Sequence, residues 1–360
     1  MRNPEFGPAA LVVAAALLFA ACGAAATPSP TPQATQAPGA TPTAAASAGP
    51  EAARAQVCEA AKAEGKVVYW HNLAKPDVIA EEFNKTYPGI QVEWLQSRPD
   101  AMVQALMTEL STGRKPSADI LYGELNILKT VFDANADDDT IDWKALGAAE
   151  DILTDAGNAV RIQRVLGGLV YNTTTVKKEE LPNTWAGLLD QKWKGQLVVD
   201  SRARPFDQLS LLWGHDATIS YVKQLLANQV LVITGGTAGM LAVAGGQAKI
   251  TTGGRSESTA EEKSKGAPLE IHYLEVIPTF DAYNMVPKGA PHPNAAKCMV
   301  AWMATDGAAA FEKAEFKQNI SRPEGASPSD TLVAVDTPAK AATVAEIGAE
   351  IQKLYAGTGG

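Results

Sequence analysis

The sequence predicts an α/β fold in which short buried strands alternate with covering helices. Between residues 65 and 123 the pattern is strand, helix, strand, helix, strand. This rhythm is typical of a parallel sheet with helices on its faces. With 360 residues and 46% hydrophobic content, the chain can bury one large core or two medium-sized cores.

The charge balance argues against a nucleic-acid partner. The chain has 31 basic and 40 acidic residues, for a net charge of -9. Nucleic-acid-binding surfaces are usually basic, although an acidic chain can still hold a local cationic pocket. Its three cysteines, Cys22, Cys58 and Cys298, are too few and too scattered for a disulfide framework or a zinc site. We expect no cofactor and no bound structural metal.

Residues 1–21 have the pattern of a signal peptide. Arg2 gives a positive start, and residues 9–21 form an apolar stretch shorter than the ~20 residues that span a bilayer. The stretch ends in "FAAC", which resembles the lipobox of bacterial lipoproteins, whose cysteine is acylated and becomes the new N-terminus. The resemblance implies lipidation at Cys22 and anchoring to the cell membrane. The alternative is a secretory peptide cleaved nearby, with Cys22 incidental.

Residues 22–50 are predicted to be a disordered tether behind that cysteine. From residue 24 to residue 50 the chain consists of Ala, Thr, Pro, Ser, Gln and Gly, with no charge and no aromatic side chain. Such a segment cannot bury enough apolar surface to fold, and its prolines keep it extended. It would hold a folded domain away from a membrane.

The elements of the first half follow from local patterns. After a helical stretch at residues 51–64, "KVVYW" reads as a buried strand. Val78, Ile79 and Phe83 recur at helical spacing until the chain reaches Pro88 and Gly89. "IQVEWL" alternates as a strand does, "PDAMVQALMTELSTG" reads as a helix ended by glycine, and "ADILYG" is another buried strand.

The second half repeats these signals less regularly. "GGLVYNTTTV", "VLVITGG" and "AKITTGG" read as strands, and the last two run into glycines. "LEIHYLEVIPTFDAYNMVPKG" contains a long β-like stretch that could return the chain to its first sheet. "PNAAKCMVAWMATDGAAAFEKA" reads as two helices interrupted near Asp306 and Gly307.

Several of these segments resemble a known family. "EGKVVYW", "ADILYG", "LVYN", "LPNTWAGLLDQKWKGQLVV", "VPKGAPHPNAAKCMVAWMATDGAAAF" and "SRPEG" occur in the order found in extracytoplasmic solute-binding proteins of ABC importers. The resemblance is to the branch that includes ferric-iron and organic-anion binders. It covers residues 64–325, and "LPNTWAGLLDQKWKG" and "APHPNAAK" are its most specific parts.

The resemblance implies a two-lobed periplasmic-binding-protein-like fold of type II, each lobe a mixed sheet flanked by helices. The chain would cross between the lobes twice, near residues 168–172 and 274–281. Residues 51–168 would form the first part of lobe 1 and residues 169–274 lobe 2. Residues 275–360 would complete lobe 1 and add the C-terminal helices. It also implies a monomeric, non-enzymatic receptor that closes around a small-molecule solute and delivers it to an ABC permease in the membrane.

Candidate ligand-binding residues follow from a rule for open α/β sheets, in which ligands bind beyond the carboxyl ends of the strands. The rule selects side chains in the loops after the predicted strands, although the aromatic ones among them could equally belong to a lobe core. The candidates are Trp70, His71, Asn72, Arg98, Tyr122, Glu124, Tyr171, Arg202, Arg204, Gly236, Thr237, Arg255 and Tyr273.

The arginines point to an anionic solute. Arg202 and Arg204 follow the predicted strand "QLVV", and Arg255 follows another in the same lobe. The planar guanidinium suits bidentate capture of a carboxylate or a phosphorus-containing group, although each arginine could also be solvated surface. Gly235 and Gly236, with Thr237 as the expected N-cap, would add backbone N–H groups to such a site or form a simple turn.

Metal binding is weakly indicated. Residues 133–139 ("DANADDD") imitate the start of a calcium loop but lack its glycine and final glutamate, which favours a solvated acidic turn. Ferric-iron binders of the family commonly use an adjacent tyrosine pair, which this sequence lacks. The alternative function is Fe(III) binding through His71, Tyr122, Tyr171 or Tyr273, with the arginines holding a synergistic anion.

Two further expectations remain. A secreted enzyme is a third, less favoured function, because no nucleophile–base or metal-ligand spacing is recognisable. Cys58 and Cys298 both fall in the proposed lobe 1, outside the cytoplasm, where a disulfide between them could form.

Overall fold

The computed structural model describes residues 49–317, 326, 327 and 329–357. The predicted signal peptide, Cys22, the tether up to residue 48 and "SRPEG" lie outside these residues. The α-helices in the described part are α1 (Pro50–Glu64), α2 (Pro76–Thr86), α3 (Pro99–Ser111), α4 (Leu125–Asp133), α5 (Phe206–Trp213), α6 (His215–Ala227), α7 (Gly236–Ala244), α8 (Ser256–Ser264), α9 (Pro293–Ala304), α10 (Ala308–Glu315) and α11 (Pro338–Ala356).

The strands form a continuous mixed sheet with the order β2-β1-β3-β9-β4-β7-β5-β6, to which β10 is added beside β9 and β8 beside β4. Pairing is parallel among β1, β2 and β3, and antiparallel where β9 meets β3 and β4. The sheet is therefore mixed rather than wholly parallel. The strands are β1 (Lys66–His71), β2 (Gln91–Gln96), β3 (Ile120–Gly123), β4 (Ala159–Asn172), β5 (Leu197–Asp200), β6 (Leu231–Ile233), β7 (Ile250–Arg255), β8 (Leu269–His272), β9 (Val276–Met285) and β10 (Thr331–Ala334).

Two groups of core residues define two lobes. In the first lobe, successive residues of β1 face opposite sides of the sheet, as the period of a strand requires. Val67 and Tyr69 pack with α1, α2, α9 and α10, whereas Val68 and Trp70 pack with α3 and α4. Both faces of this sheet are covered, which explains why β1 and β3 read as near-continuous apolar runs.

The second lobe repeats this arrangement around β5 and the end of β4. Leu169 and Tyr171 contact a core shared with α5, α6 and α11, while Val170 faces α7. The same alternation along one strand places a helical layer on each face of this sheet as well.

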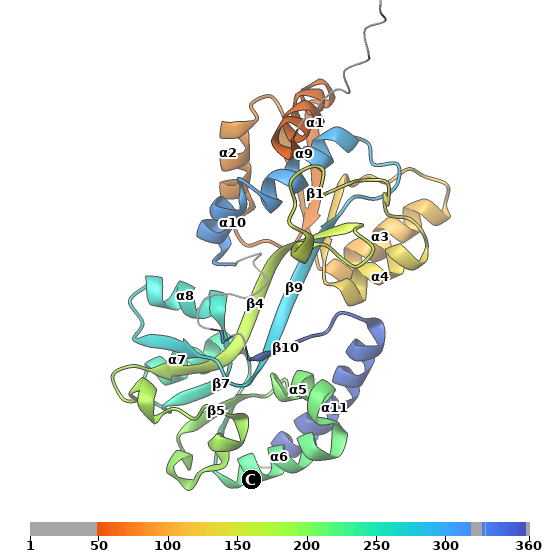
Figure 1. Cartoon of the computed structure of the whole chain (residues 1–360). Coiled ribbons are helices and arrows are strands. Elements are labelled where there is room, and N and C mark those ends of the chain that lie inside the picture. Colours follow the sequence, from red (N-terminus) through yellow and green to blue (C-terminus); the bar gives the residue numbers. More distant parts are fainter. Residues whose placement is uncertain (1–48, 318–325, 328, 358–360) are drawn as a thin grey trace, which may run out of the picture. The chain divides into compact units, whose positions relative to one another are not determined.

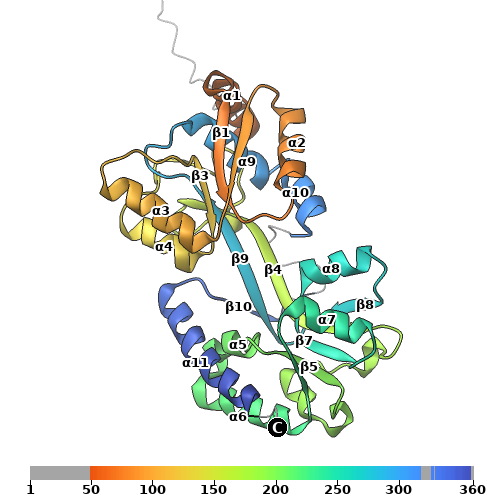
Figure 2. The ribbon, with the colours of Figure 1, turned by 180° about the vertical axis from the view of Figure 1, so that it is seen from behind.

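The long strands β4 and β9 belong to both lobes and lie side by side between them (Figures 1 and 2). Residues 159–166 of β4 pair with β9, and residues 167–172 pair with β7 and β8 in the second lobe. The crossing of β4 thus begins just before the expected residues 168–172. In β9, residues 276–279 pair with β10, and the strand then continues into the first lobe.

The C-terminal part of the chain differs from the expected assignment. Residues 275–360 were assigned to lobe 1 together with the C-terminal helices, and α9 and α10 do pack there. However, Val333 of β10 and Ile347, Ile351 and Tyr355 of α11 belong to the core of the second lobe. The helix α11 packs on α5 and α6 because its apolar stripe completes that core.

A disulfide joins Cys58 of α1 to Cys298 of α9, a pairing that the sequence left open. It ties the first helix of the described chain to a helix that follows the whole second lobe. The acidic turn at residues 133–139 is less solvated than expected, because Asp137 is buried and accepts a hydrogen bond from Asn158 Nδ2 at 2.7 Å. None of the described helices combines the length and apolar character needed to cross a membrane.

Candidate ligand-binding site

A cavity of about 660 Å³ lies between the two lobes beside β4 and β9. Six of the residues predicted from strand ends line it together: Asn72, Tyr122 and Glu124 from the first lobe, and Arg202, Arg204 and Arg255 from the second. An adjoining cavity of about 280 Å³ is shared by the three arginines and is lined by Gly236 and Thr237. The structure thus brings eight of the predicted residues to one continuous region.

Arg202 is held by a carboxylate of its own loop. Asp200, at the end of β5, accepts hydrogen bonds from Arg202 Nη2 at 2.6 Å and from the backbone N–H groups of Arg202 and Gly235. Burial alone would raise the pKa of Asp200, but these hydrogen bonds outweigh it and lower the pKa. The Asp200 carboxylate therefore stays charged and neutralises Arg202.

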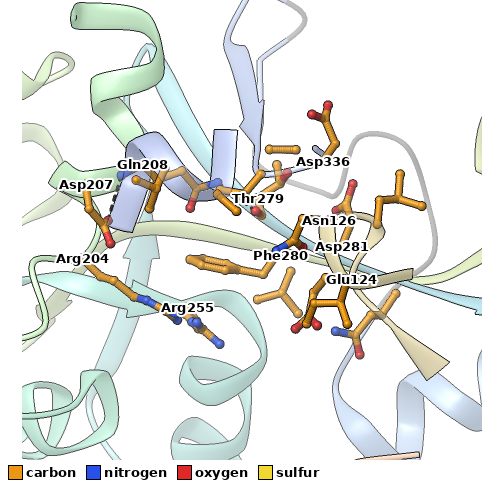
Figure 3. A pocket seen from close by; sticks show the side chains of 18 of the residues that line it. Glu124, Asn126, Arg204, Asp207, Gln208, Arg255, Thr279, Phe280, Asp281 and Asp336 are labelled. Atoms are coloured by element: carbon orange, nitrogen blue, oxygen red, sulfur yellow. Dashed lines mark hydrogen bonds between the residues drawn. The ribbon is translucent and has the colours of Figure 1, made fainter. Parts of the chain in front are cut away.

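Arg204 and Arg255 lie around the ring of Phe280, which projects from β9 (Figure 3). Their guanidinium carbons are 5.6 Å and 3.8 Å from the ring centroid. Arg204 makes no hydrogen bond or ion pair with any described residue. Burial lowers the pKa of Arg255. The negative charge of Glu257 opposes this shift, and the positive charge of Arg204 adds to it. Two cations held together on an aromatic ring are stabilised when an anion lies between them.

Asp207 lies in the first turn of α5, beside these arginines. Its Oδ1 accepts a hydrogen bond from the backbone N–H of Gln208 at 2.8 Å, drawn in Figure 3. Burial raises the pKa of Asp207 to about 6, although the nearby Arg204 opposes the shift. Gly348 of α11 lies against it, since a Cβ there would be 3.5 Å from Asp207 Cβ.

The wall formed by the shared strands carries polar side chains. Asp281 of β9 binds Arg164 of β4 through two nearly parallel contacts, Nε to Oδ1 at 2.9 Å and Nη2 to Oδ2 at 2.5 Å. Gln163 lies next to a bulge in β4, where the register against β9 shifts between Arg161 and Gln163. A bulge re-aims the side chains that follow it, and Gln163 lines the cavity.

Five predicted residues lie elsewhere. Trp70 and Tyr171 are still within strands and belong to the two cores. His71, the last residue of β1, is fully buried, and burial lowers its pKa to about 4. The Arg98 side chain is 81% exposed and pairs with Asp100 at 2.7 Å. Tyr273 lines a separate cavity of about 320 Å³, and burial raises its pKa to about 12.

The N-cap of α7 also differs from the prediction. The helix begins at Gly236 with Gly235 as its N-cap, so Thr237 lies in the first turn. Gly235 has φ +103°, a left-handed conformation that favours glycine. At Gly236 a Cβ would come within 2.6 Å of the carbonyl oxygen of Gly253, which explains why a residue without a side chain occupies this close approach.

Strand-end reasoning missed a set of lining residues that come from three places. These places are the shared strands β4 and β9, the start of α5, and the face of α11 that lines the cavity. The residues are Gln163, Thr279, Phe280, Asp281, Asp207, Gln208, Ala341, Val344, Ala345, Gly348 and Gln352. Only Asp207 and Gln208 carried a local signal, because they come within three residues of the end of "DSRARP". The others reach the cavity through long-range packing.

The residues considered for Fe(III) binding do not converge. Of His71, Tyr122, Tyr171 and Tyr273, only Tyr122 lines the cavity between the lobes. Across the described ranges, no cluster of three or more His, Cys, Asp or Glu side chains could hold a metal ion.

Two α/β lobes joined by paired long strands, with a polar cavity between them, define a type II periplasmic-binding-protein fold. The profile of a family described as bacterial extracellular solute-binding proteins matches residues 78–323. The chain belongs to this family.

Comparison with solved structures supports the same fold. Iron-bound HitA from Pseudomonas aeruginosa is 18% identical, with TM-score 0.62, over 82% of this chain and 99% of that chain. The spermidine/putrescine protein PotD from Streptococcus pneumoniae is 16% identical, with TM-score 0.61, over 81% and 99%. AfuA from Actinobacillus pleuropneumoniae, with fructose-6-phosphate bound, is 19% identical, with TM-score 0.53, over 81% and 97%. A search of curated proteins gives no match.

Proposed function

We propose that this protein is the solute receptor of an ABC importer and captures a small anionic solute, a carboxylate or a phosphorus-containing compound, between its lobes. The observation that carries the proposal is the pairing of Arg204 with Arg255 on Phe280. Arg204 makes no ion pair with a described residue, unlike Arg202, and the carboxyl group nearby is that of the buried Asp207, whose pKa is raised to about 6. A charged group held in a cavity without a partner is suited to a ligand of opposite charge.

The structural neighbours support a receptor but not one solute. They are an iron-bound protein, a spermidine/putrescine transport protein and a protein with fructose-6-phosphate bound. Among these, a sugar phosphate has the anionic group that the arginines would bind. Ferric iron is less well supported, because the residues considered as its ligands lie in different parts of the structure.

Ligand capture and lobe closure can be tested together. Native mass spectrometry of protein purified without refolding should show a co-purified acidic solute. Adding that solute to stripped protein should reduce the radius of gyration in solution scattering, because β4 and β9 would bend as the lobes close. It should also raise the melting temperature by mass action. A saturated protein of unchanged size would contradict closure, and a neutral or metallic ligand would contradict the anion proposal.

The family lies outside the cytoplasm, and we propose that acylated Cys22 anchors the protein to the membrane that carries the permease. The apolar run ending in "FAAC" supports this proposal. In cells, Cys22→Ser should move the protein from the membrane fraction to the soluble fraction with its melting temperature unchanged. Continued membrane association of the variant would exclude the anchor.

A further inference from the structure

The cavity contains unpartnered hydrogen-bond acceptors away from its arginines. Gln163 is 8% exposed, and its Oε1 is buried without a hydrogen-bond partner in the described part of the chain. The Oε2 atoms of Glu124 and Glu257 are likewise buried without a hydrogen-bond partner among the described residues. All three side chains line the cavity. Buried acceptors without donors are unfavourable, so this arrangement favours a ligand that brings donors.

The two carboxylates come from different lobes and line the same cavity. Glu124 precedes α4 in the first lobe, and Glu257 lies in the first turn of α8 in the second. Burial raises the pKa of Tyr122, and the negative charges of both Glu124 and Glu257 raise it further. The negative charges of the two carboxylates thus act on the same phenol.

Other charged groups of the lining are already neutralised by the protein. Asp281 is held by Arg164, Asp336 lies 2.7 Å from Lys340, and Lys317 lies 3.2 Å from Glu315. Asp207 lies beside Arg204, at the cationic part of the cavity. Glu257 has only a 3.8 Å contact to Arg255 and a hydrogen bond from Ser258 at its Oε1. Glu124 has no side-chain partner among the described residues, which leaves it as the least compensated carboxylate of the lining.

Figure 3 shows Glu124 lying away from the ends of Arg204 and Arg255, with Phe280 beside the arginines. The acceptors of the cavity thus extend away from its cationic part, from Glu257, which lies 3.8 Å from Arg255, to Glu124, which lies farther from the arginines. A hydroxyl group would offer one donor and no charge, whereas an ammonium group offers three donors and a positive charge. The two carboxylates and the amide oxygen match the ammonium better.

We propose that the solute is zwitterionic, with its acidic group bound by Arg204 and Arg255 and an ammonium group bound by Glu124, Glu257 and Gln163. This inference rests on the proposed function and adds a second pole to the ligand. Such a solute would also connect the lobes, because Glu124 belongs to the first lobe and the arginines to the second. It would favour the closed form for that reason.

The test compares matched compounds by titration calorimetry on the whole protein stripped of ligand. The probes are 4-aminobutyrate and 3-aminopropylphosphonate, with butyrate and propylphosphonate as the same acids without the ammonium group. We expect at least one amino acid to bind about tenfold tighter than its matched acid, as expected for a desolvated charge pair. Glu124→Gln should remove this difference and leave the affinity for the simple acids unchanged or higher.

Glu257→Gln serves as a second variant in case Glu124→Gln does not fold, and it should reduce the same difference. The control is Glu81→Gln, an exposed glutamate of α2 outside the cavity, which should bind like the wild type. Equal binding of amino and matched acids by the wild type would overturn the zwitterion inference and leave the anion receptor intact. Failure of every acid to bind would overturn both.

Discussion

Replacing Arg204 by alanine is expected to weaken solute binding by roughly 2 to 5 kcal/mol, the cost of removing one partner of a desolvated charge pair. Arg204→Lys should also weaken binding, because a point charge cannot reproduce the planar fork or its stacking on Phe280. The stability of the unliganded protein should change little, since Arg204 makes no ion pair with a described residue. Calorimetry with the co-purified solute measures the first effect and thermal unfolding the second.

Arg98→Ala is the matched control, because that side chain is 81% exposed and pairs locally with Asp100. Its effect on binding should stay within ~0.5 kcal/mol, as for other exposed substitutions. If Arg204→Ala binds the solute as the wild type does, the anion site is not at this pair of arginines. Arg202 is a poor choice for this test, because replacing it would also remove hydrogen bonds that Asp200 accepts from its side chain.

Removing the Cys58–Cys298 disulfide is expected to lower the free energy of unfolding by about 2 to 5 kcal/mol. The bond closes a loop with a sequence separation of 240 residues, so it strongly restricts the unfolded chain. A Cys58→Ala/Cys298→Ala double variant should therefore unfold at lower denaturant concentration. Solute affinity should be retained, because neither cysteine lines the cavity.

The remaining cysteine supplies the control for this second experiment. Cys22→Ser changes a cysteine that takes no part in the Cys58–Cys298 disulfide and should leave the unfolding midpoint unchanged. The double variant and the wild type should also converge when the wild type is unfolded in the presence of a reductant. Equal midpoints for the wild type and the double variant under oxidising conditions would show that the disulfide contributes nothing to stability.

Much of the fold was predictable because its signals are local. Alternating faces, glycine stops and proline turns identify the strands and helices one at a time. The sheet's mixed direction and the place of α11 depend on which distant faces meet, and apolar periodicity alone does not specify the partner. The sequence predicted C-terminal helices with lobe 1, but only packing shows that Ile347 and Ile351 of α11 join α5 and α6.

The site was predictable in part for a similar reason. The strand-end rule found Asn72, Tyr122 and Arg204. It also selected His71, which is not in the loop but is the buried last residue of β1. Arg202 and Arg204 belong to the same short motif and have different environments, because Asp200 can reach only the nearer one. No local pattern distinguishes Phe280, which reaches the cavity from a strand that serves both lobes.

The position of α11 and the disulfide together determine when the two lobes can fold relative to synthesis of the chain. The first lobe needs α9 and Cys298, and the second needs Val333 and the helix that ends the described chain. Neither core can be completed while the last quarter of the polypeptide is still being synthesised or translocated. Because its contacts link distant parts of the chain, folding is delayed until those parts have arrived. We therefore expect the chain to remain unfolded while it is exported and to complete its second lobe only after α11 has emerged.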